Sequence, residues 1–512
     1  MLISLLVVGL LASCAPQQAG NPAAEGQYVI GDTGGDWGYP TPFAAYPRGP
    51  GYLRMSFIFD TLVWKDKDGF SSALAEDWNF DHEDLSYTFR LHEDVKWHDG
   101  TSFSADDVVF TYQYLQEKMF HWADLSGIDR IEKIDENQVK MYLEEPDASF
   151  INNIAGVVPL LPRHIWEEVE EPEDFTGSQA VVGTGPFRLE KYKREQGIYR
   201  FSAFHDYYLG DPKVENLLFI RVSDPQQALL RGDVNYAQVQ PEAVSALEET
   251  GFEVVKGTHD WSLKLMFNHR ESPLDDVDFR RALAKAINLD ELVERALRGH
   301  GLPGSPGLIS PDSRWFHEEL PRHPFDTQEA VEILRDLGYT MGNGDLIGKD
   351  GEKVALKLLA LSDYAREAEI VGEQLRKLGV EVELRSAEQS LVDSSIRSWD
   401  FDLAITGHGG IGGDPEILKR FMTGEASPHL NARSENPDLR EKLMEQGREL
   451  NPEKRESLVS DIQRIYAQDL PTYTLHYPTW YFVYNGDVEW FFTRDGIASG
   501  IPLPLNKMAL LQ

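Results

Sequence analysis

The segment YTFRLHEDVKWHDGTSFSADDVVFTYQYL, residues 87–115, carries the most specific structural signal of this chain. Alternating β-forming residues on both sides of Asp99-Gly100 predict two strands joined by a turn. Ser104 precedes Asp106 and Asp107, an order that is typical of a helix N-cap followed by a negatively charged first turn. Apolar residues then recur at helical spacing, at Val108, Val109, Tyr112 and Leu115. The segment therefore predicts a β-hairpin that leads directly into an amphipathic helix.

Residues 354–406 show a clear alternation of strands and helices. The order is strand VALKLLAL, helix DYAREAEIVGEQLRKLG, strand VEVELR, helix EQSLVDSSIRS and strand FDLAIT. This order predicts a parallel sheet with right-handed crossovers. Since open parallel sheets bind ligands beyond the carboxyl ends of their strands, we expect the loop GHGGIGGDP, residues 407–415, to form one wall of a ligand cleft. The loop GDTGGDW, residues 31–37, follows a short strand at Tyr28–Ile30 and is expected to form a second wall.

The N-terminal residues predict export and a lipid anchor. The apolar run Leu2–Ala12 is too short to span a bilayer, which needs about 20 residues, and it suits the core of a secretory signal. Cys14 is the only cysteine of the chain and follows small residues, an arrangement that resembles a bacterial lipobox. We expect a signal peptide at residues 1–13 and a lipidated flexible tether at residues 14–25. The protein would then be a periplasmic or cell-surface lipoprotein, held to a bacterial membrane by its lipid alone.

The composition narrows the possible partners. The chain of 512 residues carries 49 basic and 85 acidic residues, which gives a formal net charge of −36. This excess of negative charge argues against nucleic-acid binding. It fits either cationic ligands or a well-solvated acidic surface. Apart from the N-terminal run, no stretch approaches the length of an apolar membrane span, and a single cysteine excludes a disulfide within the chain.

Motifs of catalytic and cofactor sites are weak or missing. Gly407, Gly409 and Gly412 match the spacing G-x-G-x-x-G, but Pro415 interrupts the segment and no acidic residue ends a strand about 20 residues further on, as ribose binding would require. The chain has no GxSxG elbow and no HExxH helix, and its histidines form no tight metal-ligand pattern. We therefore predict a protein that is not an enzyme, with no catalytic residue, no cofactor and no bound metal.

Four blocks of sequence resemble one protein family. Residues 87–115 look like the signature of the family 5 extracellular solute-binding proteins, which are the peptide, nickel and oligosaccharide receptors of ABC importers. Three further blocks resemble the family in the same order, VGTGPFRLEKYK (182–193), FNHRESPLDDVDFRRALAKAINLDELVERALRG (267–299) and FDTQEAVEILRDLGY (325–339). The resemblance implies an α/β fold of the type II periplasmic-binding-protein kind, a two-lobed flytrap with an additional α+β domain.

The resemblance also implies a division of the chain. Lobe I would combine residues 26–65, 182–261 and 477–512, the additional domain would be residues 66–181, and lobe II would be residues 262–476. The chain would pass between the lobes near Thr258–Leu265 and His476–Trp480, and these crossings would form a hinge.

The implied function is that of a receptor. The lobes would close on a peptide-like or other small polar solute and deliver it to the permease subunits of an ABC importer, and a monomer is sufficient for this task. An oligosaccharide or a metal chelate is the alternative ligand. A secreted hydrolase that uses carboxylates, or a sensor subunit that signals through a membrane kinase, is a more remote alternative.

The ligand-binding residues follow from the two predicted loops and the hinge. In peptide-binding members of the family, the loop that corresponds to residues 407–415 contains a tryptophan and an aspartate that pairs with the peptide's amino group. His408 and Ile411 take these positions here, which puts ordinary peptides in doubt because a buried ammonium group needs a counter-charge. Aromatic rings near the hinge offer stacking on sugars or cations instead, and Asp36 could meet a hydroxyl or an ammonium group. The candidate residues are Asp36, Trp37, Trp261, Trp399, Gly407, His408, Gly409, Ile411, Tyr477 and Trp480.

Overall fold

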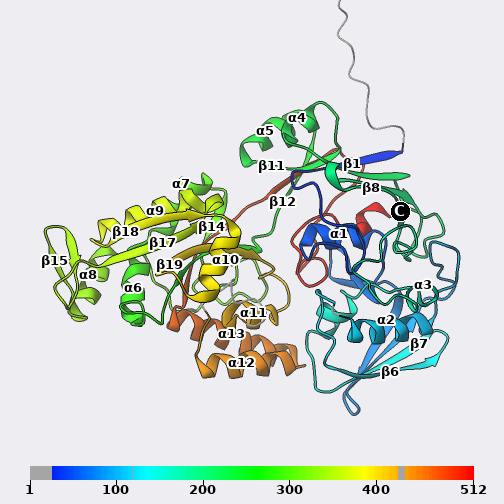
Figure 1. Ribbon diagram of the computed structural model, residues 1–512, viewed down its shortest axis with the longest axis horizontal. Helices are drawn as coiled ribbons and strands as arrows, with labels where there is room; N and C mark the ends of the chain where they lie inside the picture. Colours follow the sequence, from blue (N-terminus) through cyan, green and yellow to red (C-terminus); the bar gives the residue numbers. More distant parts are fainter. Residues whose placement is uncertain (1–25, 119, 425–432, 512) are drawn as a thin grey trace, which may run out of the picture.

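A computed structural model describes residues 26–118, 120–424 and 433–511 of the chain (Figure 1). Its largest sheet has seven strands in the order β12-β21-β11-β1-β10-β9-β8, all within the ranges predicted for lobe I. The strands are β1 (Gln27–Asp32), β8 (Phe187–Lys193), β9 (Ile198–Ala203), β10 (Asn216–Arg221), β11 (Tyr236–Val239), β12 (Glu253–Lys256) and β21 (Tyr481–Tyr484). The helices of this part are α1 (Gly49–Ser56), α4 (Pro225–Leu230) and α5 (Val244–Glu249).

The additional domain is built on a four-stranded antiparallel sheet in the order β4-β5-β7-β6. Its elements are β4 (Ala75–Asp81), β5 (Ser86–Leu91), α2 (Ala105–Glu117), β6 (Ile128–Asp135), β7 (Gln138–Leu143) and α3 (Arg163–Trp166), preceded by the hairpin of β2 (Val63–Lys65) and β3 (Phe70–Ser72). The predicted N-cap is confirmed, because Ser104 and Asp107 form a reciprocal capping box at the start of α2.

The predicted hairpin of residues 87–104 is only half correct. β5 forms, but the residues after it make a single isolated bridge between Lys96 and Ser102 instead of a second strand. The reason is that β5 already pairs with β4 on one side and with β7 on the other, so it has no free edge. Trp97 and Phe103 bury their rings in the core, and the loop lies against the domain in place of extending its sheet.

Lobe II contains a six-stranded sheet in the order β14-β20-β13-β19-β17-β18. Its strands are β13 (Trp261–Phe267), β14 (Gly301–Pro303), β17 (Ala355–Leu361), β18 (Glu381–Ala387), β19 (Leu403–Gly409) and β20 (Thr472–Pro478), and β15 (Thr340–Gly342) and β16 (Asp345–Ile347) form a separate hairpin. Its helices are α6 (Val277–Lys285), α7 (Leu289–Leu297), α8 (Thr327–Asp336), α9 (Ala365–Lys377), α10 (Gln389–Ser398), α11 (Ile417–Thr423), α12 (Pro437–Arg448) and α13 (Pro452–Asp469).

The predicted alternation of residues 354–406 is confirmed, and the predicted parallel pairing holds for part of the sheet. β17 is parallel to both β18 and β19. β13 is antiparallel to β19 and to β20, so the complete sheet is mixed. The antiparallel strands are the ones by which the chain enters and leaves lobe II, and local patterns within residues 354–406 carry no information about them.

The hydrophobic core shows which parts move together. One continuous cluster joins lobe I to the additional domain, with Phe57, Trp64, Phe150 and Trp166 all buried in it. A separate cluster lies between the lobe II sheet and its helices. Shared core favours motion as one body, so we treat lobe I and the additional domain as a unit that faces lobe II across a hinge.

The chain passes between the two bodies twice. The first crossing segment is residues 257–260, between β12 and β13, and the second is residues 479–480, between β20 and β21. The segments run side by side, because the backbone N–H of Gly257 donates to the carbonyl of Trp480 at 2.7 Å. Both overlap the predicted crossings. Within residues 26–118, 120–424 and 433–511, no helix has the length and apolar character needed to cross a bilayer. Cys14 and the predicted signal and tether lie outside the described residues.

Candidate ligand-binding cleft

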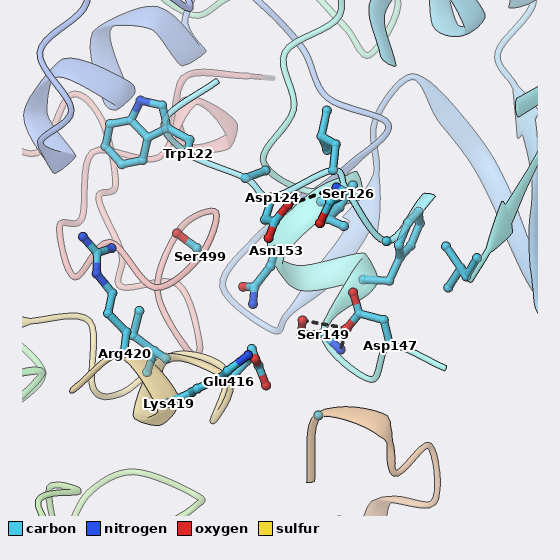
Figure 2. A pocket seen from close by; sticks show the side chains of 18 of the residues that line it. Trp122, Asp124, Ser126, Asp147, Ser149, Asn153, Glu416, Lys419, Arg420 and Ser499 are labelled. Atoms are coloured by element: carbon cyan, nitrogen blue, oxygen red, sulfur yellow. Dashed lines mark hydrogen bonds between the residues drawn. The ribbon is translucent and has the colours of Figure 1, made fainter. Parts of the chain in front are cut away.

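A cavity of about 820 Å³ lies between the additional domain and lobe II. Its lining comes from residues within 115–127 and 143–154 of the additional domain and from residues within 416–420 and 443–448 of lobe II, together with Ser499. Figure 2 shows Glu416, Lys419 and Arg420 on one wall and Trp122, Asp124, Asp147 and Ser149 on the other. The volume falls within the range of small-molecule sites, about 300–1,000 Å³.

The two walls touch at one edge of the cavity. The backbone N–H of Ala148 donates to the carbonyl of Gly447 at 2.8 Å, and Arg448 forms an ion pair with Glu145 at 2.6 Å. These contacts join the additional domain to the end of α12. The bodies are therefore closed around the cavity in this structure.

Two carboxylates line opposite walls of the cavity. The side chain of Glu416 accepts a hydrogen bond from the amide of Gln446 at 2.8 Å, and no ion pair of Glu416 is found among the residues that the structure describes. Burial raises the pKa of Glu416 to about 7, with Asp414 and Asp147 adding to the rise and Lys419 opposing it. Burial also raises the pKa of Asp147, against the hydrogen bonds that it accepts from Ser149. The walls thus hold carboxylates that are poorly neutralised.

A buried ion pair supports the wall beneath Glu416. Asp414 and Arg455 are each only 7% exposed and pair in a bidentate manner, at 2.9 and 2.5 Å. The guanidinium group of Arg455 also donates to the carbonyl of Ala148 at 3.2 Å and to Gln446. Arg455 therefore connects lobe II to the additional domain at the cavity edge.

The glycine loop at the end of β19 packs against protein on both sides. A Cβ atom at Gly407 would lie 2.6 Å from Nε1 of Trp261, and one at Gly412 would lie 1.7 Å from Oδ1 of Asp260. A Cβ atom at Gly413 would lie 2.9 Å from the carbonyl oxygen of Ser499 in lobe I. Glycine is required here because the backbone approaches the hinge and the opposite lobe so closely.

The side chains of His408 and Ile411 in this loop, and of Tyr477 on β20, are buried. His408 is 4% exposed, its ring stacks on Phe421 at 3.7 Å, and its Nε2 lies 2.9 Å from Nζ of Lys264. Ile411 is 2% exposed and belongs to an apolar cluster of lobe II. The hydroxyl of Tyr477 donates to the carbonyl of Leu308 at 2.9 Å. All three contact protein in the positions that they occupy here.

The other predicted ligand-binding residues described next lie at three places in the fold. Trp261 and Trp480 lie at the hinge with ring centroids 6.0 Å apart. Trp37 donates from Nε1 to Asp32 at 2.6 Å. Asp36 accepts hydrogen bonds from the hydroxyls of Tyr192, Tyr199 and Tyr46 at 2.6, 3.2 and 2.9 Å. Burial would raise the pKa of Asp36, but these hydrogen bonds outweigh it and hold the pKa below its ordinary value.

Trp399 lies apart from the rest. It precedes β19, whereas the glycine loop follows that strand, and seven strand residues separate the two ends by roughly 20 Å. Its ring lies beneath the guanidinium groups of Arg270 and Arg433, at 4.2 and 4.8 Å. We leave it out of the site proposed below.

The predicted ligand-binding residues therefore differ from those that line the cavity. Within the described part of the chain, none of the predicted ligand-binding residues lines the cavity. Glu416 and Lys419 could have been suspected, because they follow the glycine loop directly. Trp122 and Asp147 had no such signal, because only the packing of the additional domain against lobe II brings them there. The described residues contain no group of three or more His, Cys, Asp or Glu side chains arranged to hold a metal ion.

The comparison with protein families agrees with this architecture. The model of the family described as bacterial extracellular solute-binding proteins, family 5 Middle, matches residues 69–426. The chain belongs to this family. The predicted family and the predicted type II flytrap fold are confirmed. At the level of the family, so is the predicted function of a solute-binding receptor that serves an ABC importer.

Individual relatives of this family 5 protein align with most of its length. It is 26% identical to the oligopeptide-binding protein AppA of Bacillus subtilis over 91% of this chain and 89% of that protein. It is 27% identical to a dipeptide-binding protein of Pseudomonas aeruginosa over 89% of this chain and 91% of that protein. The solved structure of NikA from Brucella suis in complex with Fe(III)-EDTA superimposes with a TM-score of 0.80, at 21% identity, over 93% of this chain and 98% of that one.

Proposed function

We propose that this family 5 protein captures a peptide-like solute in the cavity between the additional domain and lobe II, with Glu416 facing the solute's ammonium group. The observation that carries the proposal is the Glu416 carboxylate, which is partly buried on the cavity wall and accepts a hydrogen bond from the neutral amide of Gln446. A carboxylate in such a place is costly unless a cation pairs with it. An incoming ammonium group supplies that cation, which replaces the counter-charge missing at Ile411.

The remaining charges of the cavity favour a solute with both signs. Lys118, Lys419 and Arg420 contribute to the same lining, so the cavity walls carry positive as well as negative side chains. An oligosaccharide carries no charge that would match these walls. The names of the Bacillus subtilis and Pseudomonas aeruginosa relatives, an oligopeptide- and a dipeptide-binding protein, support the same ligand class.

Closure would couple capture to transport. The solute contacts both bodies, so its binding energy favours the closed arrangement over the open one. The closed monomer then docks on the permease subunits of the importer, tethered to the membrane through Cys14. No covalent step is needed for this cycle.

The ligand proposal is tested by calorimetry with Ala-Ala-Ala and its N-acetylated form, which lacks the ammonium group. We expect the free peptide to bind about 10-fold or more tightly than the acetylated one. Glu416→Gln should remove this difference, because it removes the counter-charge. Glu445→Gln on the exposed surface of α12 makes the same charge change and should leave both affinities unaltered. Equal affinity for the two peptides in the unmodified protein would contradict the role of Glu416, and a thermal shift with oligosaccharides or chelates alone would contradict the peptide class.

The lipid anchor is tested separately from the ligand. Cys14→Ser should release the protein from the membrane fraction and abolish its labelling by radioactive palmitate, because the thiol is the proposed attachment point. Ser13→Ala keeps a small residue before Cys14 and should remain membrane-bound. Undiminished labelling of the Cys14→Ser protein would show that the anchor lies elsewhere.

A further inference from the structure

His259 occupies the first crossing segment and uses both ring nitrogens. Its Nδ1 lies 2.7 Å from Oδ2 of Asp312, and its Nε2 lies 2.8 Å from the hydroxyl of Thr479. The residue is only 8% exposed. Asp312 belongs to the lobe II segment between β14 and α8, and Thr479 belongs to the second crossing segment. One imidazole therefore joins both crossing segments to lobe II.

We propose that His259 is a positioning residue for solute capture, which clasps both crossing segments to lobe II so that closure bends the chain on the lobe I side. Within residues 26–118, 120–424 and 433–511, the crossing segments are the only covalent links between the bodies. A rotation of lobe II must therefore change the backbone dihedral angles at one end of each crossing segment. The hydrogen bonds of His259 hold the end that adjoins lobe II, and residues 257–258 and 480–481 remain as the bending points.

The clasped lobe II segment also reaches across to lobe I. Arg314, two residues after Asp312, forms an ion pair with Asp495 at 3.1 Å. The loop that contains Asp495 is held from the other side, because the ammonium group of Lys65 donates to the carbonyls of Gly496 and Ala498 at 3.2 and 3.0 Å. Asp312 thus lies two residues from a lobe II side chain that contacts lobe I in this structure.

The charges around the clasp explain why an imidazole is suited to this place. Burial raises the pKa of Asp260 to about 6, and the negative charges of Asp312 and Asp495 add to the rise. Arg314 faces Asp495, and His259 faces Asp312, whose pKa is lowered to about 2 because hydrogen bonds from His259 and Ser310 outweigh its burial. Asp260 has a hydrogen bond from the hydroxyl of Thr258 at 2.6 Å. Removing the ring would leave Asp312 among like charges and favour separation of the bodies.

Hydrogen exchange measured by mass spectrometry on the full chain tests the clasp without any solute. His259→Leu should raise exchange about tenfold or more in residues 257–260, 479–480 and 308–314 together, because one side chain protects all three. His205→Leu, which replaces an exposed histidine paired with Asp211, should change none of them. A rise confined to one segment, or no rise, would overturn the proposal.

Conservative variants separate the clasp from a loss of folding. Asparagine at 259 reaches as far as Nδ1 and glutamine as far as Nε2. His259→Asn should therefore retain protection of residues 308–314 and lose that of 479–480, and His259→Gln should show the reverse. Identical exchange in both variants would overturn the separate roles of the two nitrogens.

The link to capture is measured as a distance between the bodies. Spin labels at Glu249→Cys and Ser394→Cys, in the full chain carrying Cys14→Ser, report the separation of exposed sites on α5 and α10. With Ala-Ala-Ala as the probe, His259→Leu should lower the closed fraction about tenfold at a fixed peptide concentration. An undiminished closed fraction would overturn the role in capture. If Ala-Ala-Ala fails to bind the unmodified protein, the ligand proposal is wrong, and the exchange experiment still decides the clasp.

Discussion

Replacing Arg455 with methionine is expected to lower the free energy of unfolding by about 3–5 kcal/mol. The guanidinium group and Asp414 are buried together beneath the cavity wall, each 7% exposed. Removing one partner leaves the carboxylate of Asp414 buried without a cation, and this uncompensated charge is the main cost. The contact of Arg455 with the carbonyl of Ala148 is lost as well, which weakens the edge at which lobe II meets the additional domain.

Urea denaturation of four proteins measures this effect. The double replacement Asp414→Asn with Arg455→Met should recover most of the loss, because no buried charge remains. Arg448→Met breaks the exposed pair with Glu145, in which the side chains are 49% and 53% exposed, and should cost less than about 1 kcal/mol. A loss for Arg455→Met as small as that for Arg448→Met would show that the buried pair contributes little.

Replacing Lys264 with methionine is expected to have the opposite sign and to raise the free energy of unfolding at pH 7 by about 1–4 kcal/mol. Lys264 on β13 is fully buried, and the hydrogen bond found for its ammonium group among the described residues is the one with Nε2 of His408. Two cations cannot be held at this distance inside the protein. Burial accordingly lowers the pKa of Lys264 to about 7, and burial together with Lys264 lowers the pKa of His408 well below its ordinary value.

The pH dependence identifies Lys264 as the source of the effect. Between pH 7 and the ordinary lysine pKa of 10.5, the unfolded chain binds a proton that the folded protein does not. Stability therefore rises with pH in this window, and the full penalty is present below it. The Lys264→Met protein lacks this contribution, so the stability difference should shrink as pH rises from 7 to 10. Thermal unfolding at several pH values measures it, and a constant difference would contradict the assigned cause.

Local patterns were sufficient for much of the secondary structure. The elements of residues 354–406 follow from apolar periodicity, and the start of α2 follows from Ser104 and its acidic first turn. The glycine-rich segment Met341–Gly351 likewise has the composition of a turn, and its first seven residues belong to the hairpin of β15 and β16. The second strand predicted within residues 87–104 does not form, because both edges of β5 are already paired with other strands. The residue pattern of one segment cannot show whether the adjacent strand is already paired along both of its edges.

The candidate site shows the same limit more strongly. Ile411, His408 and Tyr477 were placed in the correct loop and strand, yet their side chains are buried in lobe II. Which side of a loop faces a ligand depends on the surface against which the loop packs. Here the glycine loop packs against Asp260 and Ser499, and the open space lies one turn further along, at Glu416.

The family, the flytrap fold and the order of the helices and strands of residues 354–406 were therefore available from the chain of residues alone, because each depends on short-range patterns or on blocks of motif. The cavity, the Asp414–Arg455 pair and the His259 clasp were decided only by tertiary structure. His259 and Thr479 of the clasp are separated by 220 residues, and the members of all three features belong to segments with no shared local pattern. The packing of whole domains sets the distances between such segments. The same packing decides which charges and rings are removed from water, so their burial cannot be read from local sequence.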